Sequence, residues 1–101
     1  MANDAPASAM NAMKVEKDNP KAIRLFREAI ELNPKYSLPY SNRGLARQKK
    51  GDWDGAIADF SKAIEIYPGD APAYTSRGVA KLNKGDLDGA IADFSKAIGL
   101  F

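Results

Sequence analysis

Residues 51–64 read GDWDGAIADFSKAI, and residues 85–98 repeat this stretch as GDLDGAIADFSKAI. The two copies differ at a single position, where Trp53 in the first is replaced by Leu87 in the second. The match extends outward at the same spacing, because residues 37–67 and 71–101 are identical at 18 of 31 positions. A third, fainter copy lies upstream within residues 22–34. A fixed period of this size indicates stacked supersecondary units.

Each unit is predicted to form two helices. Within residues 53–67 the apolar side chains recur at intervals of three and four, which places them on one face of a helix. Asp52 is positioned to cap the N-terminus of this helix. The preceding residues 37–50 are predicted to form the other helix, and their basic C-terminal end suits the helix dipole. The next unit repeats this scheme, with helices expected near residues 71–84 and 87–100.

A glycine falls inside each first helix, at Gly44 and Gly78. A glycine in a helix interior costs about 1 kcal/mol relative to alanine. We expect close packing against the second helix to compensate, at the small residues Ala56 and Ala90. Each unit is then an antiparallel hairpin, and hairpins stack because one alone cannot bury its apolar face.

This pattern resembles the tetratricopeptide repeat, a 34-residue helix-turn-helix unit. The residues at its aromatic and small positions, expected to form the structural core, are Tyr40, Gly44, Ala56, Phe60, Ala63, Tyr74, Gly78, Ala90, Phe94 and Ala97. The resemblance implies an all-α fold, an α-solenoid of antiparallel helix-turn-helix hairpins with a 34-residue period and about three repeats. It divides a single domain, residues 1–101, into a degenerate repeat 1 (3–36), a repeat 2 (37–70) and a repeat 3 (71–101) that lacks a C-terminal capping helix.

Arg43 and Arg77 stand where the family usually has a large aliphatic residue. An inward arginine needs a partner, because burying an unpaired charge is costly. Both units carry an aspartate sixteen residues later, at Asp59 and Asp93. We therefore predict two intra-repeat ion pairs, Arg43–Asp59 and Arg77–Asp93. The alternative is a set of separately solvated charges.

Both ends of the chain depart from the family pattern. Residues 5–17 favour a helix, but Met10 and Met13 replace the expected glycine and large core residue, so loose packing is expected there. No capping helix follows repeat 3, and exposed apolar residues there would favour self-association into a homo-oligomer or domain swapping of hairpins. The alternative is that the chain is part of a longer parent. The predicted self-association end comprises Ile91, Ile98, Leu100 and Phe101.

In the tetratricopeptide repeat family, first helices line a concave groove that binds peptides, so the resemblance implies a protein-binding scaffold. The corresponding peptide-groove residues are Ser41, Asn42, Leu45, Gln48, Lys49, Thr75, Ser76, Val79, Leu82 and Asn83, with a fainter contribution from Asn11 and Lys14. Their hydroxyls and amides can hydrogen-bond a ligand backbone, and their aliphatic groups can seat apolar side chains. The alternative for any one of them is a plain solvated helix face.

One subgroup of the family binds the C-terminal carboxylate of chaperones with two asparagines and several basic residues. Asn11 and Asn42 fall at the two asparagine positions. The basic positions hold Ala7, Pro72 and Ser76 instead. We therefore do not expect this chain to bind chaperone tails.

Charge alternates between the predicted helices. Residues 37–50 and 71–84 carry basic residues and no acid, whereas the helices that follow them begin with aspartates. If the first helices form a groove, that groove is positive and favours acidic protein or peptide ligands. The alternative is simple matching of side-chain charges to helix dipoles.

The composition argues against an enzyme, a cofactor and a metal site. The chain has no histidine and no cysteine, which removes the commonest general base, thiolate ligands and disulfides. No glycine-rich phosphate loop precedes a helix. The Asp-x-Asp-Gly runs at residues 52–55 and 86–89 lack the further ligands of a calcium loop, and we assign them to helix capping.

Two other functions stay open as alternatives. The basic first helices could bind single-stranded RNA, with Tyr40, Tyr74 and Trp53 as stacking candidates, although the net charge of +2 is small for such a role. The chain could also be a purely structural homo-oligomer. No apolar run approaches the roughly 18 residues of a membrane span, and residues 1–10 do not resemble a secretory signal. We therefore expect no membrane association and a cytoplasmic location.

Overall fold

The computed structural model describes residues 20–100, which form helices and no strand. The helices are α2 (Pro20–Leu32), α3 (Ser37–Lys49), α4 (Trp53–Ile66), α5 (Ala71–Lys84) and α6 (Leu87–Gly99). The sequence predictions that fall outside residues 20–100 concern the helix at residues 5–17 and the residues Met10, Asn11, Met13, Lys14 and Phe101.

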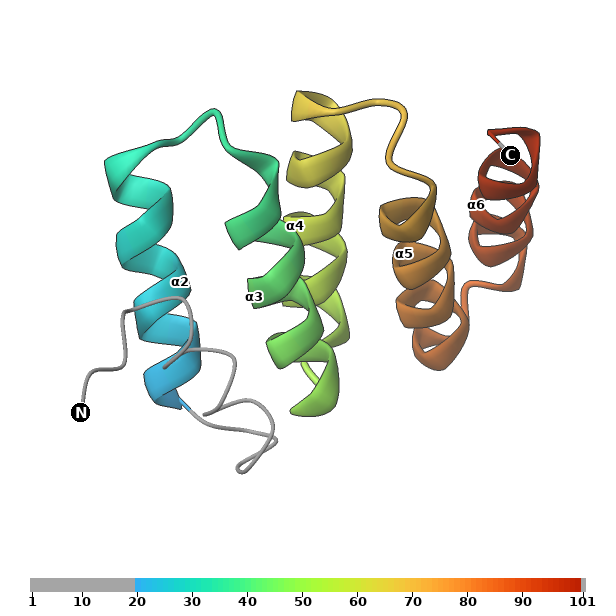
Figure 1. Cartoon of the computed structure of the whole chain (residues 1–101). Helices are drawn as coiled ribbons and strands as arrows, with labels where there is room; N and C mark the ends of the chain where they lie inside the picture. Colours follow the sequence, from blue (N-terminus) through green and yellow to red (C-terminus); the bar gives the residue numbers. More distant parts are fainter. Residues whose placement is uncertain (1–19, 101) are drawn as a thin grey trace.

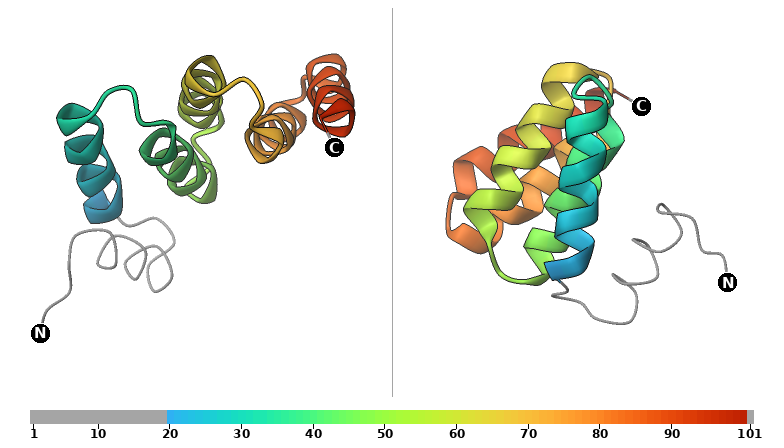
Figure 2. Two further views of the ribbon diagram at one scale, coloured as in Figure 1. Left: turned by 45° about the horizontal axis from the view of Figure 1, so that its top comes forward. Right: turned by 90° about the vertical axis from the view of Figure 1, so that its left-hand side faces the viewer.

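The helices form a single array of antiparallel hairpins. Each helix packs against the next one along the chain, from α2 to α6 (Figure 1). A turned view places α3 and α5 in one row and α2, α4 and α6 in the other (Figure 2). α3 and α5 also contact each other directly. The result is an elongated body of 45 × 25 × 21 Å, which confirms the predicted all-α solenoid of helical hairpins.

Aspartates begin three of the helices. Asp52 Oδ1 accepts a hydrogen bond of 3.0 Å from the Gly55 amide, and Asp86 Oδ1 accepts one of 2.9 Å from the Gly89 amide. These contacts confirm the capping role predicted for the two Asp-x-Asp-Gly runs. Asp70 caps α5 in the same way, which the sequence analysis did not predict. Each cap satisfies an amide that has no partner within its own helix.

Glycines with a left-handed backbone end both first helices. Gly51 has a φ of 84° and Gly85 a φ of 96°. Residues that carry a Cβ rarely adopt a backbone with such positive φ angles. The chain reverses at these residues and enters α4 and α6. The short turns therefore fix α3 against α4 and α5 against α6 as antiparallel pairs.

The glycine inside α3 lies against an aromatic ring. A Cβ on Gly44 would lie 2.7 Å from Cε1 of Phe60, and Gly78 makes the equivalent approach in the next repeat. The close packing expected at these glycines is therefore present, and the atoms nearest to each of them belong to the phenylalanine ring of the second helix. A side chain at either position would force the phenylalanine ring or the helix that carries it to shift.

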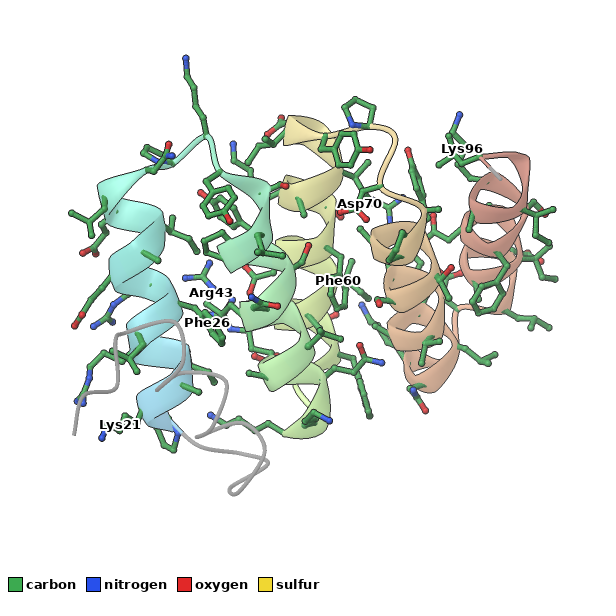
Figure 3. The ribbon with its side chains drawn as sticks, viewed as in Figure 1. Lys21, Phe26, Arg43, Phe60, Asp70 and Lys96 are labelled. Carbon is green, nitrogen blue, oxygen red and sulfur yellow. The ribbon has the colours of Figure 1, made fainter. Side chains whose placement is uncertain are left out.

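The core lies between successive helices. Phe26 is buried between α2 and α3, and Phe60 is buried between α4 and α5 (Figure 3). Seven of the predicted core residues are buried: Gly44, Ala56, Phe60, Ala63, Gly78, Ala90 and Ala97. The other three, Tyr40, Tyr74 and Phe94, are only half-buried. Phe94 differs from Phe60 because no helix among residues 20–100 covers the far side of α6.

Candidate functional site

The residues predicted to line a groove that fall within residues 20–100 all lie on α3 and α5. We call the surface that they form the α3–α5 surface. None of them is buried, and those that are exposed are Leu45, Lys49, Thr75, Leu82 and Asn83. α3 and α5 run in the same direction and contact each other (Figure 1). The structure therefore brings the two predicted sets together on neighbouring helices.

Apolar side chains cross this surface. Leu45 and Leu82 are exposed, and Val79 is half-buried. Leu38 is also exposed and lies seven residues before Leu45, on the same face of α3. Leu38 was not among the residues predicted from the sequence, although its spacing from Leu45 places it on the same helix face.

Several polar side chains of the α3–α5 surface already have partners. Thr75 Oγ1 donates to the Ala71 carbonyl at 3.2 Å, and Asn83 Nδ2 donates to the Val79 carbonyl at 3.0 Å. These two donors are therefore less available to a ligand than the sequence analysis expected. Gln48 differs, because its Oε1 is buried and accepts no hydrogen bond from the described residues. A buried acceptor without a partner costs about 1–3 kcal/mol.

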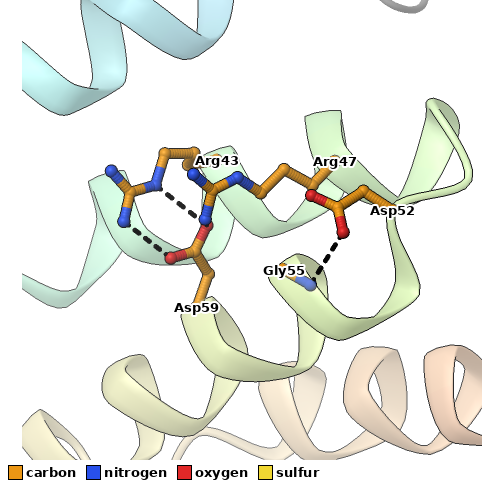
Figure 4. A network of polar contacts seen from close by, with 5 residues as sticks. All are labelled: Arg43, Arg47, Asp52, Gly55 and Asp59. Atoms are coloured by element: carbon orange, nitrogen blue, oxygen red, sulfur yellow. Dashed lines mark hydrogen bonds and ion pairs between the residues drawn. The ribbon is translucent and has the colours of Figure 1, made fainter.

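An ion cluster joins α3 to α4. Arg43 Nε and Nη2 donate to the two carboxylate oxygens of Asp59 at 2.9 and 2.8 Å (Figure 4). Arg47 Nη1 donates to the same carboxylate at 3.1 Å. The guanidinium of Arg43 also lies 5.8 Å from the ring centre of Tyr40, within cation–π range. The first predicted pair is thus present, and the side chain of Asp59 is nearly fully buried.

The same cluster recurs between α5 and α6. Arg77 Nε and Nη2 each donate to Asp93 at 2.8 Å, and Lys81 Nζ lies 3.2 Å from the same carboxylate. Burial acts to raise the pKa of Asp93, but hydrogen bonds from Arg77 and Lys81 outweigh it and hold the pKa below its ordinary value. The hydrogen bond to Asp93 raises the pKa of Arg77.

Each cluster places two cations around one carboxylate. The second cation, Arg47 or Lys81, was not predicted, although it lies four residues after the predicted arginine and so on the same helix face. An excess positive charge therefore remains on both α3 and α5. Arg47 and Lys81 also lie in the last turns of their helices, where a cation suits the dipole. This position fits the dipole interpretation of the charge pattern, whereas a positive groove stays a prediction.

The tyrosines offered as RNA-stacking candidates are engaged within the protein. Arg77 lies 5.4 Å from the ring centre of Tyr74, as Arg43 does at Tyr40. One face of each ring is therefore occupied by a guanidinium. Trp53 is half-buried at the start of α4.

The exposed apolar side chains of the last helix form a second candidate surface. Ile91, Ile98 and Leu100 are exposed, as the sequence predicted for the self-association end. Leu87 is exposed on the same helix and was not included in that prediction. Phe101, the fourth predicted residue, lies outside residues 20–100.

Two other kinds of feature are missing from residues 20–100. No group of three or more histidine, cysteine, aspartate or glutamate side chains is arranged to hold a metal ion in this part of the chain. No helix within it combines the length and the hydropathy needed to cross a membrane.

Known families and structures match this arrangement. Family models match the chain over residues 38–70 and 60–92, both described as Tetratricopeptide repeat, and over residues 16–51, described as TPR repeat. No match was found among curated proteins.

Solved structures share the fold. A crystal structure of MamA is 33% identical, with a TM-score of 0.87 over 96% of this chain and 58% of that chain. The second TPR of Spaghetti (RPAP3), bound to the HSP90 peptide SRMEEVD, is 25% identical, with a TM-score of 0.89 over 96% of this chain and 89% of that chain. The Yersinia enterocolitica type III secretion chaperone SycD, in complex with a peptide of the translocator YopD, is 23% identical, with a TM-score of 0.91 over 96% of this chain and 73% of that chain. The chain spans 58% and 54% of the lengths of two MamA chains.

Proposed function

We propose that this chain, which belongs to the tetratricopeptide repeat family, binds a peptide or protein segment on its α3–α5 surface. The observation that carries the proposal is the exposure of Leu45 and Leu82 on two parallel, neighbouring helices. Exposed apolar side chains on adjacent helices can hold apolar residues of a ligand, and the polar groups around them orient it. The family and its structural neighbours support a protein-interaction scaffold and not an enzyme.

A structural neighbour supports a peptide as the ligand, because the second TPR of RPAP3 was solved with an HSP90 peptide. The likeness to SycD supports the fold alone at its level of identity. The HSP90 peptide itself is not proposed for this chain, because Pro72 and Ser76 stand where a carboxylate clamp needs basic residues.

The charge on α3 and α5 favours an acidic segment. Each ion cluster leaves one cation in excess, and Arg47 and Lys81 keep 28% and 21% of their side-chain surface exposed. Lys49 adds an exposed charge at the end of α3. An acidic ligand would be attracted by these groups, and salt would weaken the attraction.

The test uses a displayed library of random peptides selected against the full chain. Selected peptides are then titrated with three variants, Leu45→Asp and Leu82→Asp on the surface and Leu32→Asp as the matched control. Leu32 is exposed on α2, outside the α3–α5 surface. Its replacement by aspartate therefore changes the net charge of the chain by the same amount as the two surface variants without altering the proposed site. We expect the two surface variants to lose at least tenfold in affinity, since each removes a leucine contact that the bound peptide would bury. Equal binding by all three variants would refute the proposal.

We also propose self-association through the end formed by α6, because Ile91 and Ile98 are exposed on one face of it and Leu100 is exposed just after its last residue. Contiguous exposed apolar groups commonly mark an interaction surface. Light scattering over a wide concentration range tests this. The mass should rise with concentration in the native chain and stay that of a monomer in Ile98→Asp. A native chain that is monomeric throughout would refute self-association and leave the peptide-binding proposal untouched.

A further inference from the structure

The helices α4 and α6 have nearly the same sequence but different surroundings. α5 packs against α4 and leaves Ile64 only 8% exposed, whereas its equivalent on α6, Ile98, is 71% exposed. Ile57 is half-buried, and its equivalent Ile91 is 53% exposed. We call the surface of Leu87, Ile91, Phe94 and Ile98 the α6 face. Three of its residues repeat Ile57, Phe60 and Ile64 of α4, Leu87 replaces Trp53, and no helix among residues 20–100 covers this face.

Polar groups complete the α4–α5 contact. Arg77 of α5 donates from Nη1 to Ser61 Oγ of α4 at 3.0 Å, and Lys84 of α5 forms an ion pair with Asp54 of α4. Both contacts cross from one repeat to the next. The helix that packs on α4 is therefore selected by charge as well as by shape.

The α6 face has the same polar groups in the same register. Ser95 and Asp88 are the equivalents, one repeat later, of Ser61 and Asp54. Both are exposed, and neither has a partner among residues 20–100. An incoming helix could pair an arginine with Ser95 and a lysine with Asp88.

Small residues on α5 allow its close approach to α4. Ala80 is fully buried in one cluster with Ala56 and Phe60, and Ala73, seven residues earlier, is also buried. The residues of α5 that meet α4 in this way are Ala73, Arg77, Ala80 and Lys84. They define a register of a small residue at position 1, arginine at position 5, a small residue at position 8 and lysine at position 12.

We propose that the α6 face docks a helix of another polypeptide that carries this register: small residue, arginine, small residue, lysine. The proposal rests on the suggested use of the α6 end as an interface and deepens it by naming the chemistry of the partner. Shape complementarity comes from the four apolar side chains of the α6 face, and Ser95 and Asp88 set the register. A helix with bulky side chains at the two small positions would be excluded.

The test uses a fluorescent peptide with the sequence of residues 70–84, stapled between positions 75 and 79. The staple holds the helix, because an isolated helix of this length is marginal in water. The two stapled positions belong to the α3–α5 surface, so the staple does not replace any of the four residues that define the register. Fluorescence anisotropy follows the titration of this peptide with the full chain and its variants.

We expect the native chain to bind and Ile98→Asp to lose about tenfold or more in affinity, because an isoleucine that the docked peptide would cover becomes a charge. Ser95→Ala should lose about fivefold, the value of one hydrogen bond. Ala80→Leu in the peptide should abolish binding. Leu32→Asp in the chain is the control and should bind normally. Ile98 and Leu32 are both largely exposed, so neither change should disturb folding.

A charge exchange distinguishes specific pairing of Asp88 with the peptide's lysine from nonspecific hydrophobic binding. Asp88→Lys in the chain should weaken binding about threefold, and Lys84→Asp in the peptide should restore it. Binding that Ile98→Asp leaves unchanged would overturn the proposal, because the peptide would then be displacing α5 from α4. Absence of binding to the native chain would also overturn it. A chain that is monomeric at all concentrations but binds the peptide would refute self-association alone.

Discussion

Replacing Asp93 with asparagine tests the role of the ion clusters. Arg77 donates two bonds of 2.8 Å to this carboxylate, Lys81 lies 3.2 Å away, and the Asp93 side chain is only 5% exposed. Removing one partner of a fully buried pair costs about 3–5 kcal/mol. Arg77 keeps 18% of its side-chain surface, so water can solvate part of the freed charge, and asparagine keeps one acceptor oxygen. We therefore expect Asp93→Asn to lower the free energy of unfolding by about 2 kcal/mol.

Urea unfolding followed by circular dichroism measures this loss, and a thermal melt should show a fall of about 8–16 °C in Tm. Asp88→Asn is the matched control, because Asp88 lies on the same helix and is exposed. The control should change stability by less than about 0.5 kcal/mol. The double variant Arg77→Leu/Asp93→Leu should recover most of the loss, since it removes both charges of the bidentate pair, and Lys81, which loses its partner, keeps 21% of its side-chain surface exposed. A change in Asp93→Asn as small as that of the control would refute the reasoning.

The same carboxylate makes stability depend on pH. The pKa of Asp93 is lower in the folded chain than its ordinary value, so the folded state favours the charged form. Its contribution is complete above the unfolded pKa of about 3.9 and is lost as the pH falls through the folded value. We expect stability to fall below about pH 4, and Asp93→Asn to remove part of that slope. Parallel pH profiles of the two proteins would contradict this.

Further substitutions test the packing. Gly44→Ala should destabilise the chain by about 1–2 kcal/mol, because the new methyl group meets the enclosed ring of Phe60. Gly78→Ala should cost less, because the ring of Phe94 is only half-buried and can move toward solvent; equal Tm values for the two variants would contradict this difference. Gln48→Leu introduces the residue that the next repeat carries at this position and removes an unpaired buried acceptor, so it should raise the free energy of unfolding by about 1 kcal/mol in a urea titration. A loss of stability in this variant would show that the glutamine has a partner in solution.

Much of the fold and part of the site follow from local sequence rules. Apolar spacing defined the helices, Asp52 and Gly51 marked where one ends and the next begins, and the repeat period required that the hairpins stack. The pairing of Arg43 with Asp59 could also be predicted, because each repeat that carries the arginine also carries an aspartate sixteen residues later. These features depend on contacts within one repeat. Such contacts join residues at a fixed separation in the sequence, and that separation recurs in the next repeat.

The tertiary structure decided what each side chain meets across repeats. Ile64 and Ile98 have almost the same local sequence, yet one is covered by α5 and the other is open. The second cation of each cluster, the unpaired oxygen of Gln48 and the bond from Arg77 to Ser61 also depended on neighbouring helices. The physical reason is that burial and pairing belong to the contact between two elements, whereas periodicity and capping belong to one.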